Sequence, residues 1–258
     1  MKKQTFEFEP IGFVSTCFKE KFGIPRQSGL TSHARGVVKL KDDPNLRTAL
    51  RGIETFSHLW LVFVFHEHGS RNWKPSIRPP RLGGAKKVGV LASRSPHRPN
   101  PIGLSAVALE GVDLEAKGGP EIFVRGVDLL DGTPILDVKP YIPYADSLPD
   151  ANAGWANEPI SRIEVEFSEE AEVALALRLS REPVSGSGLL GASGYTNLKA
   201  LIVEMLELDP RPAFQKRQMS SQNPKAHGTR YGFKLFDFDV KWEIRDGKFW
   251  VLDLVNLP

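Results

Sequence analysis

The residues with the clearest chemical potential lie in a proline-rich stretch, SRSPHRPNPIGLS, at positions 93–105. Its three prolines lack an amide donor and fix their own φ angle, so no helix runs through them. The residue before each proline is restricted to extended geometry as well. We therefore expect a stiff loop that holds Arg94, His97, Arg98 and Asn100 in fixed directions, which raises the question of what these polar groups bind.

A second candidate is the triplet His66-Glu67-His68, which follows a continuous apolar run at positions 59–65. Alternate residues of a strand point the same way, so the two histidines could share a face and bind a metal. No third ligand is evident from the spacing. The histidines could instead cap a strand end. We favour a third interpretation, in which one imidazole contacts a ligand in the wall of a small-molecule pocket.

Asp137 and Lys139 form a third candidate, because they lie two positions apart inside an apolar strand and therefore on one face. Such a pair is either a structural ion pair or part of a site, and the sequence does not favour one over the other. The neighbouring Asp131-Gly132 is explained by turn chemistry.

The charge distribution is the fourth feature. No acidic residue occurs between Glu67 and Glu110, and the eight basic residues in this interval are Arg71, Lys74, Arg78, Arg81, Lys86, Lys87, Arg94 and Arg98. A segment of one sign is typical of proteins that bind a polyanion. The alternative is a solvated basic loop, but the arginines beside prolines and Trp73 favour an anionic partner.

Composition excludes several classes of protein. The chain has 258 residues, of which 41% are hydrophobic, and its net charge is only +3. Its single cysteine, Cys17, permits no internal disulfide and no cysteine-rich zinc site, so we expect a reducing, cytoplasmic setting. The start lacks the apolar run of a signal peptide. The run at 59–65 is too short to cross a bilayer, which takes about 20 residues. The usual nucleotide-binding and hydrolase signatures are missing.

The elements that must position these residues are mostly strands in the first part of the chain. We expect strands at 6–14, 34–40, 58–65, 87–92, 102–114, 121–127 and 134–138. Asp43 and Pro44 should begin a helix that ends near position 53. The strand at 58–65 is apolar on both faces and should be buried on both sides. Many short strands with one helix indicate a closed or nearly closed barrel.

The second part of the chain is predicted to be a smaller α+β domain. A linker-like loop near 145–160 separates it, so we expect domains at 1–160 and 161–258. The pattern predicts a strand at 162–167, a helix at 168–180 capped by Ser168, and an amphipathic helix at 196–208. The end should be a hairpin of strands 233–245 and 248–255, joined by Asp246-Gly247. The fold class is therefore α+β, with a strand-rich barrel domain first.

Several long motifs together resemble one known family. They are SRSPHRPNPIGLS, PRLGG at 80–84, PRQSGL from 25, FSHLWLVFVFH at 56–66, DLLDGTPILDVKPY at 128–141, SLPDA at 147–151 and DPRPAF at 209–214. Along the chain these motifs follow the family's order, and they resemble the TrmO family of S-adenosylmethionine-dependent tRNA methyltransferases over about residues 5–255. The resemblance implies a β-barrel methyltransferase that works as a homodimer. It also implies methylation of the exocyclic amino nitrogen of threonylcarbamoyl-adenosine, which lies beside the anticodon.

The resemblance also implies the residues that bind S-adenosylmethionine. They are Pro25, Arg26, Gln27, His66, Glu67, Arg94, Leu104, Asp128, Leu129, Leu130 and Asp131. A carboxylate such as Asp128 or Glu67 could accept the ribose hydroxyls, and Arg94 or Arg26 could hold the methionine carboxylate in a forked ion pair. The loop at 93–105 would then form one wall of the cofactor site.

For the chemistry, we expect Asp137 to accept the proton of the target nitrogen, Lys139 to hold the threonyl carboxylate and Tyr141 to orient the base. RNA contacts are expected from Arg71, Lys74, Arg78, Arg81, Lys86, Lys87, Arg98, Arg211 and Phe214, with the second domain assisting. Arg98 could instead shape its loop, and Phe214 could pack in the core. Three competing functions are a non-catalytic RNA-binding module, a metal-dependent hydrolase using His66 and His68, and a small-molecule methyltransferase.

Overall fold

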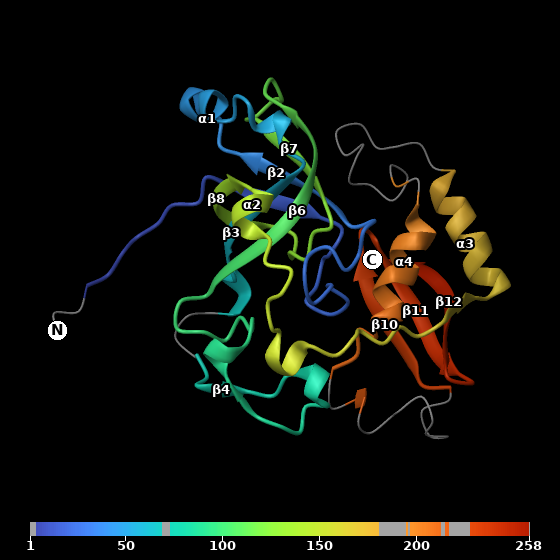
Figure 1. The fold of residues 1–258 in the computed structure, drawn as a ribbon. Helices are drawn as coiled ribbons and strands as arrows, with labels where there is room; N and C mark the ends of the chain where they lie inside the picture. The colour runs from blue at the N-terminus through green and yellow to red at the C-terminus, as the bar shows by residue number, and fades with distance from the viewer. Residues whose placement is uncertain are drawn as a thin grey trace.

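The computed structural model describes residues 4–68, 73–180, 195, 197–212, 215–216 and 228–257. Six antiparallel strands close into a barrel in the order β1-β2-β7-β6-β3-β8. They are β1 (Gly12–Thr16), β2 (Arg35–Leu40), β3 (His58–Val64), β6 (Ile102–Asp113), β7 (Glu121–Arg125) and β8 (Thr133–Pro140). Figure 1 shows this barrel in blue and green on one side of the molecule and the C-terminal sheet in red on the other. The predicted barrel and α+β class are confirmed.

The strand β3 shows how the sequence builds the barrel. Leu59, Leu61 and Phe63 point inward and are buried, while Trp60 and Val62 between them are only half-buried. The prediction that β3 is buried on both sides is therefore wrong. In a small closed barrel only the inner face fills the core, so the apolar outer residues of β3 lie on the surface.

The local predictions differ from the structure mainly at their ends. The helix α1 (Pro44–Ala49) is capped by Asp43, whose side chain accepts a hydrogen bond of 2.8 Å from the amide of Asn45, but it ends before residue 53. The first strand begins only at Gly12, and residues 4–10 form an extended arm that projects from the barrel (Figure 1). The strand expected at 87–92 is only β5 (Val88–Gly89), which pairs with β4 (Ser76–Ile77).

The C-terminal part contains a four-stranded sheet in the order β10-β11-β12-β9. Its elements are β9 (Val165–Phe167), α3 (Glu169–Leu179), α4 (Leu198–Glu207), β10 (Arg230–Leu235), β11 (Phe238–Arg245) and β12 (Lys248–Asn256). The predicted turn at Asp246-Gly247 is confirmed. The predicted Ser168 cap is also confirmed, because the Ser168 hydroxyl accepts a hydrogen bond of 3.2 Å from the amide of Ala171. The predicted first strand of the hairpin is in fact two strands, because Phe236 adopts a positive φ of 54° and turns the chain.

One hydrophobic core runs through both parts of the chain. The barrel residues Val14 and Leu61 belong to the same cluster of buried side chains as Leu201 of α4 and Trp242 of β11. The division into domains at 160 and 161 therefore stays a prediction. In the part of the chain that the structure describes, no helix is long and apolar enough to cross a membrane.

The barrel has one end at which most of the predicted site residues meet. Strand pairing places the last residues of β1, β7 and β3 beside the first residues of β8, β2 and β6. The pairs that show this are Val14 with Thr133, Arg125 with Arg35, and Val64 with Ile102. We call this the loop-rich end, because the connections 17–34, 65–101 and 126–132 all leave from it.

Candidate functional site

All predicted cofactor residues lie at or next to the loop-rich end. Residues 25–27 belong to the connection between β1 and β2, and His66 and Glu67 follow β3 directly. Arg94 lies in the loop before β6, Leu104 near the start of β6, and residues 128–131 between β7 and β8. The antiparallel barrel thus brings together segments that are up to about a hundred positions apart in the sequence.

The centre of this region is the carboxyl group of Asp128. Ser105 donates a hydrogen bond of 2.6 Å to it from β6. Burial raises the pKa of Asp128, although the hydrogen bonds from Ser105 and from the amide of Ser28, together with the charge of Arg94, act in the opposite direction. This half-buried acceptor, already held by several donors, is fixed in place for recognition of a hydroxyl or a cation.

The proline-rich loop meets the connection 17–34 at the same place. Arg94 donates a hydrogen bond of 2.5 Å to the side-chain oxygen of Gln27, and the side-chain amide of Gln27 donates to the carbonyl of Arg26. Arg26 in turn donates to the carbonyl of Arg211, at 3.2 Å. Three predicted cofactor residues are therefore linked to one another and to the C-terminal part.

An open pocket of ≈ 620 Å³ adjoins this cluster. Its lining residues are Lys19, Glu20, Lys21, Phe22, His66, Glu67, Leu130 and Asp131, which include four predicted cofactor residues. Lys21 donates a hydrogen bond of 2.8 Å to the carbonyl of Glu67 and lies 3.6 Å from its carboxylate. The pocket therefore carries both signs of charge, as a ligand with ammonium and carboxylate groups requires.

Two predicted cofactor residues have structural tasks. Asp131 accepts hydrogen bonds from the amide of Thr16 at 2.8 Å and from the ammonium of Lys19 at 2.7 Å, so its carboxylate fastens the end of β1. Leu129 is buried in the core, and its carbonyl accepts from the hydroxyl of Thr16 at 3.0 Å. Because the side chain of Leu129 is buried, the predicted contact of Leu129 with the cofactor would have to come from its backbone, and it stays a prediction.

The three residues predicted for the chemistry spread along the outer side of β8. Asp137 and Lys139 form an ion pair of 2.7 Å, with side chains 47% and 65% exposed. Asp137 lies opposite Val62, which lies opposite Leu104, so Asp137 borders the predicted cofactor region from the outside. Tyr141 is farther along, where its ring contacts that of Trp60 at 5.5 Å. The role of the pair in a site stays a prediction.

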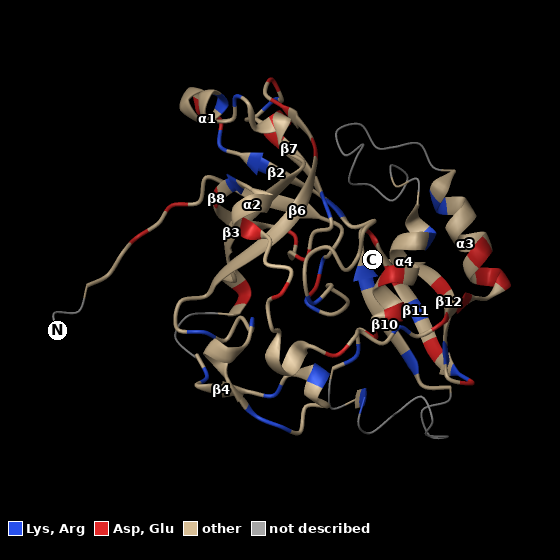
Figure 2. Ribbon diagram, viewed as in Figure 1, with Lys and Arg blue, Asp and Glu red and all other residues tan. Residues whose placement is uncertain are grey.

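The basic segment lies on the surface, as expected for contact with a polyanion. Its exposed members in the described residues are Lys74, Arg78, Arg81, Lys86, Lys87 and Arg94. Figure 2 shows this basic segment in blue around β4 and the loops beside it. Arg71 and Phe214 lie outside the described residues.

Two predicted RNA contacts are engaged within the protein. Arg98 donates to the carbonyls of Ser93 at 2.9 Å and Ser95 at 3.4 Å, so it shapes its own loop. Arg211 is only 2% exposed and donates two hydrogen bonds, of 2.8 and 2.9 Å, to Asp209. The prediction that Arg211 contacts RNA disagrees with this burial.

The histidine triplet does not form the arrangement that a metal site needs. His66 and His68 lie in the 3₁₀ helix η2 (His66–His68), which ends the alternation of β3. The ring of His68 packs against that of His97 at 5.2 Å, and burial lowers the pKa of both. The described residues contain no group of three or more histidine, cysteine or acidic side chains that could hold a metal.

The sequence reasoning missed several residues of this region. Ser105 directly follows the predicted Leu104, and strand alternation, which turns it inward toward Asp128, could have found it. No local signal identifies Lys19, Lys21 or Ser28, because their roles depend on the path of a long loop.

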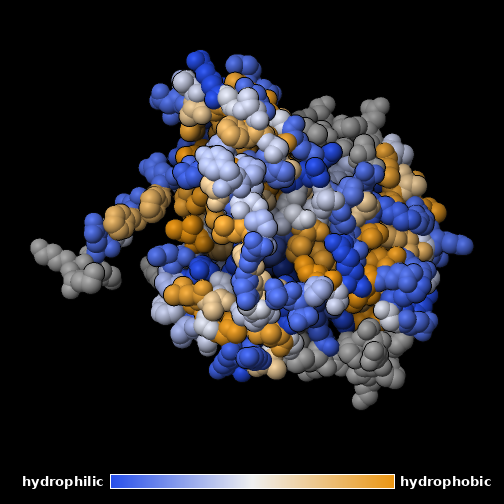
Figure 3. Space-filling view, viewed as in Figure 1, coloured by the Kyte–Doolittle hydropathy of each residue, from blue (hydrophilic) through white to orange (hydrophobic). Residues whose placement is uncertain are grey.

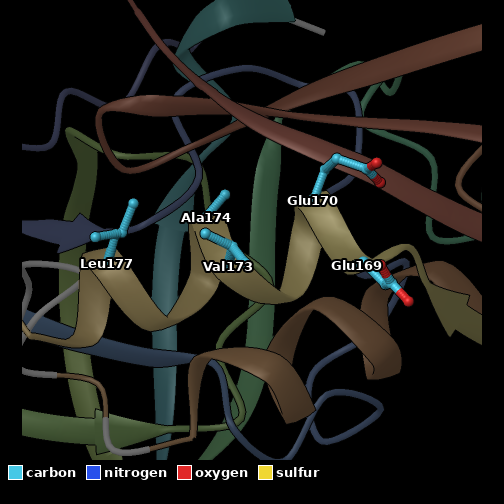
Figure 4. Close-up of a pocket in the computed structure, with 5 residues that line it drawn as sticks. All are labelled: Glu169, Glu170, Val173, Ala174 and Leu177. Atoms are coloured by element: carbon cyan, nitrogen blue, oxygen red, sulfur yellow. The ribbon is translucent and has the colours of Figure 1, made fainter.

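A second hollow lies on the C-terminal part, along the surface of α3. Its lining residues are Glu169, Glu170, Val173, Ala174 and Leu177, all from this one helix (Figure 4). It contains no predicted site residue, so the cluster around Asp128 and the adjoining pocket remain the candidate site.

Comparisons with known proteins cover nearly the whole chain. The family described as the tRNA-methyltransferase O N-terminal domain matches residues 13–147, and the TrmO C-terminal domain matches residues 160–257. The chain is 42% identical over 251 residues to the tRNA (adenine(37)-N6)-methyltransferase of Escherichia coli, with 97% of this chain and 98% of that protein covered.

Two further similarities agree with these matches. A protein of Pseudomonas aeruginosa that is provisionally named an S-adenosylmethionine-dependent methyltransferase is 43% identical, with 92% of each chain covered. The crystal structure of TrmO from Pseudomonas aeruginosa superimposes with a TM-score of 0.70 at 38% identity, covering 98% of this chain and all of that one.

Proposed function

This chain belongs to the TrmO family, and from this premise we propose that its barrel site transfers a methyl group from S-adenosylmethionine to N6 of adenine 37 in tRNA. The observation that carries this function is the similarity over nearly the full length to a methyltransferase of that specificity. The convergence of Gln27, Arg94 and Asp128 at one barrel end agrees with it.

The residues at the loop-rich end fit the groups that S-adenosylmethionine presents. Asp128 and Glu67 are acceptors suited to ribose hydroxyls or to an ammonium group, and Arg94 suits a carboxylate. When bound, the cofactor supplies an electrophilic methyl group on a sulfonium. The protein must then hold the acceptor nitrogen in line with that methyl group, and this alignment can supply several kcal/mol of the barrier.

For the acceptor, we propose the adenosine that carries a threonylcarbamoyl group at N6. The target nitrogen then belongs to a urea, whose lone pair is delocalised, so a proton acceptor assists its reaction. Asp137 is our candidate for this acceptor, with Lys139 holding the threonyl carboxylate and Tyr141 orienting the base. Their position beside Val62 and Leu104 supports the assignment of Asp137 more than that of Tyr141.

The experiment that tests the function is transfer of labelled methyl from S-adenosylmethionine to total tRNA. The tRNA is taken from cells with and without the threonylcarbamoyl modification. Label in modified tRNA alone supports both the reaction and the acceptor. Label in both pools would contradict the proposal that the threonylcarbamoyl-modified adenosine is the methyl acceptor. No label in either pool, despite cofactor binding, would contradict tRNA methylation.

The tRNA is proposed to lie along the basic segment, because most of its described cations are exposed and no acidic residue interrupts them in the sequence. A tRNA substrate agrees with the cytoplasmic location expected from the single cysteine.

We also propose that the protein is a homodimer that pairs through the outer face of the barrel. Phe13, on the outer face of β1, is 48% exposed. Phe6 and Phe8 in the projecting arm are 69% and 68% exposed. Figure 3 shows apolar surface on the barrel near the point where the arm leaves it. Large exposed apolar side chains that gather in one segment of the chain are typical of interaction surfaces. Sedimentation of the wild type and of Phe13→Ser tests this, with a monomeric wild type contradicting it.

A further inference from the structure

The connection between β1 and β2, residues 17–34, is bound to the C-terminal part along its length. The amide of Phe236 donates to the carbonyl of Cys17 at 2.9 Å, and the amide of Lys234 donates to the side chain of Glu20 at 2.8 Å. Farther along, Arg26 donates to the carbonyl of Arg211. The segment that carries the predicted cofactor residues 25–27 is therefore held by elements that follow it by about two hundred positions.

The strongest of these connections is made by Glu204 of α4. Its carboxylate accepts hydrogen bonds from the hydroxyl of Ser32 at 2.5 Å and from the amide of His33 at 2.9 Å, and the His33 ring nitrogen lies 2.9 Å away. Burial alone would raise the pKa of Glu204, but the hydrogen bonds from Ser32 and His33 outweigh it and lower the pKa. The ionised carboxylate thus holds two successive residues of the connection.

The helix that carries Glu204 is itself a firm support. Leu201, Ile202 and Met205 of α4 are fully buried or nearly so in the shared core, so the backbone at position 204 cannot shift without disturbing that core. In the opposite direction, Gln27 accepts the hydrogen bond of Arg94, and the amide of Ser28 donates to Asp128. The short stretch from residue 27 to residue 33 is therefore fixed at both ends.

We propose that Glu204 is a positioning residue of the cofactor site, which holds residues 25–33 in the geometry that binds S-adenosylmethionine. The C-terminal part then supports cofactor binding as well as any contact with tRNA. This inference depends on the proposed function, because it assigns a task to the loop that meets the cofactor. Glu204 does not touch the cofactor cluster itself, and it acts through Ser32 and His33.

The test compares Glu204→Ala with Glu207→Ala in the full-length protein. Glu207 lies on the same helix, its side chain is 16% exposed against 18% for Glu204, and its carboxylate pairs with Arg162 instead of the connection. Both changes remove one carboxylate that is mostly buried and place the best helix former at the position. The readouts are the Kd of S-adenosylmethionine by calorimetry, KM and kcat for methyl transfer to tRNA, and the midpoint of thermal unfolding.

We expect Glu204→Ala to raise the Kd and KM for S-adenosylmethionine about tenfold, within the range typical of coupling between separate sites. Its kcat at saturating cofactor and its KM for tRNA should stay near those of the wild type. Glu207→Ala should bind the cofactor like the wild type at a similar thermal midpoint. If Glu204→Ala does not fold, Ser32→Ala removes one of the same hydrogen bonds from the surface side and should raise the Kd in the same direction.

The outcomes separate this inference from the function on which it depends. Wild-type affinity in Glu204→Ala, or an equal loss in Glu207→Ala, would overturn the positioning role and leave the methyltransferase function intact. A wild type that binds no S-adenosylmethionine would overturn both.

Discussion

Ser105 of β6 donates a hydrogen bond of 2.6 Å to Asp128, which lies in the loop between β7 and β8. This bond fixes the central carboxyl group of the candidate site to the barrel wall. Because burial raises the pKa of Asp128, the carboxyl group of this residue binds a proton more tightly in the folded protein than in the unfolded chain. Ionisation of Asp128 therefore costs folding free energy, which is the expected signature of a group kept for binding.

The first prediction concerns Asp128→Asn. The variant should bind S-adenosylmethionine about 10- to 100-fold more weakly, because a hydrogen bond to a charged group contributes about 1.5–3 kcal/mol. Its thermal midpoint at neutral pH should not fall, since the change removes a carboxylate that is costly to bury. Calorimetry measures the affinity for S-adenosylmethionine, and thermal unfolding measures the midpoint. A Kd for S-adenosylmethionine equal to that of the wild type would contradict the role of Asp128 in cofactor binding.

The pH dependence of stability gives a second measurement on the same residue. Between the unfolded pKa of 3.8 and the higher folded value, the native state binds more protons than the unfolded state. The contribution of Asp128 to stability is therefore present below pH 3.8 and is lost as the pH rises through the folded pKa. The unfolding free energy of the wild type, relative to that of Asp128→Asn, should therefore decrease as the pH rises through the folded pKa of Asp128. An increase over the same pH range would contradict the raised pKa.

Much of the fold could be predicted because its signals are local. Strand alternation, the Asp43 cap and the Asp246-Gly247 turn each depend on a few adjacent residues, and all three are found. The outer side of β3 is the exception, because Trp60 and Val62 are apolar although they face outward. Their composition does not distinguish a doubly buried strand from a barrel strand with an apolar outer face.

The candidate site could be predicted in outline from the family motifs, but its contacts could not. Glu204 binds Ser32 across 172 positions, and nothing in the local sequence of either residue indicates the other. The burial of Arg211 was missed for a similar reason. Its partner Asp209 is two positions away, but the aromatic rings of Tyr231 and Phe249 that surround it come from a distant sheet.

A further prediction concerns the close packing of Gly103 against Phe63. A Cβ atom at position 103 would lie 2.2 Å from the ring of Phe63, which is buried and contacts Phe65 edge-on at 5.1 Å. Gly103→Ala should therefore displace the ring and destabilise the protein by about 1–3 kcal/mol. Because His66 follows Phe65, cofactor affinity should fall as well.

Gly89→Ala is the matched control for this change. No atom lies within 4 Å of the Cβ that it would add, so it should leave stability unchanged or raise it by up to about 1 kcal/mol. Urea unfolding of the two variants measures the difference. Equal stability would show that the ring of Phe63 moves without cost.

The ion pair of Asp137 and Lys139 yields a prediction that separates stability from chemistry. Both side chains are largely exposed, so the pair should contribute at most about 1 kcal/mol to folding. Asp137→Asn should consequently unfold at nearly the wild-type temperature. If Asp137 accepts the proton of the target nitrogen, kcat should fall about 100-fold or more while the Kd of S-adenosylmethionine stays constant.

Lys139→Met serves as the comparison for Asp137→Asn. It removes the same ion pair, so a loss of stability caused by the pair would appear in both variants. If Lys139 holds the threonyl carboxylate, Lys139→Met should raise the KM for tRNA. Its kcat should change less than that of Asp137→Asn. Full turnover in Asp137→Asn would exclude its role as the proton acceptor.

The final prediction concerns tRNA binding by the basic segment. Lys86 and Lys87 are exposed in a stretch without acidic residues, so each can contact a phosphate directly. Replacing both by alanine should weaken binding of all tRNAs and reduce the slope of log affinity against log salt by about 1 for each phosphate that these lysines bind. The control is Lys248→Ala, which also removes one positive charge per substitution. Lys248 lies on the C-terminal sheet and pairs with Glu164 and Glu166. A salt slope unchanged in Lys86→Ala/Lys87→Ala, or reduced equally in Lys248→Ala, would place the RNA on another surface.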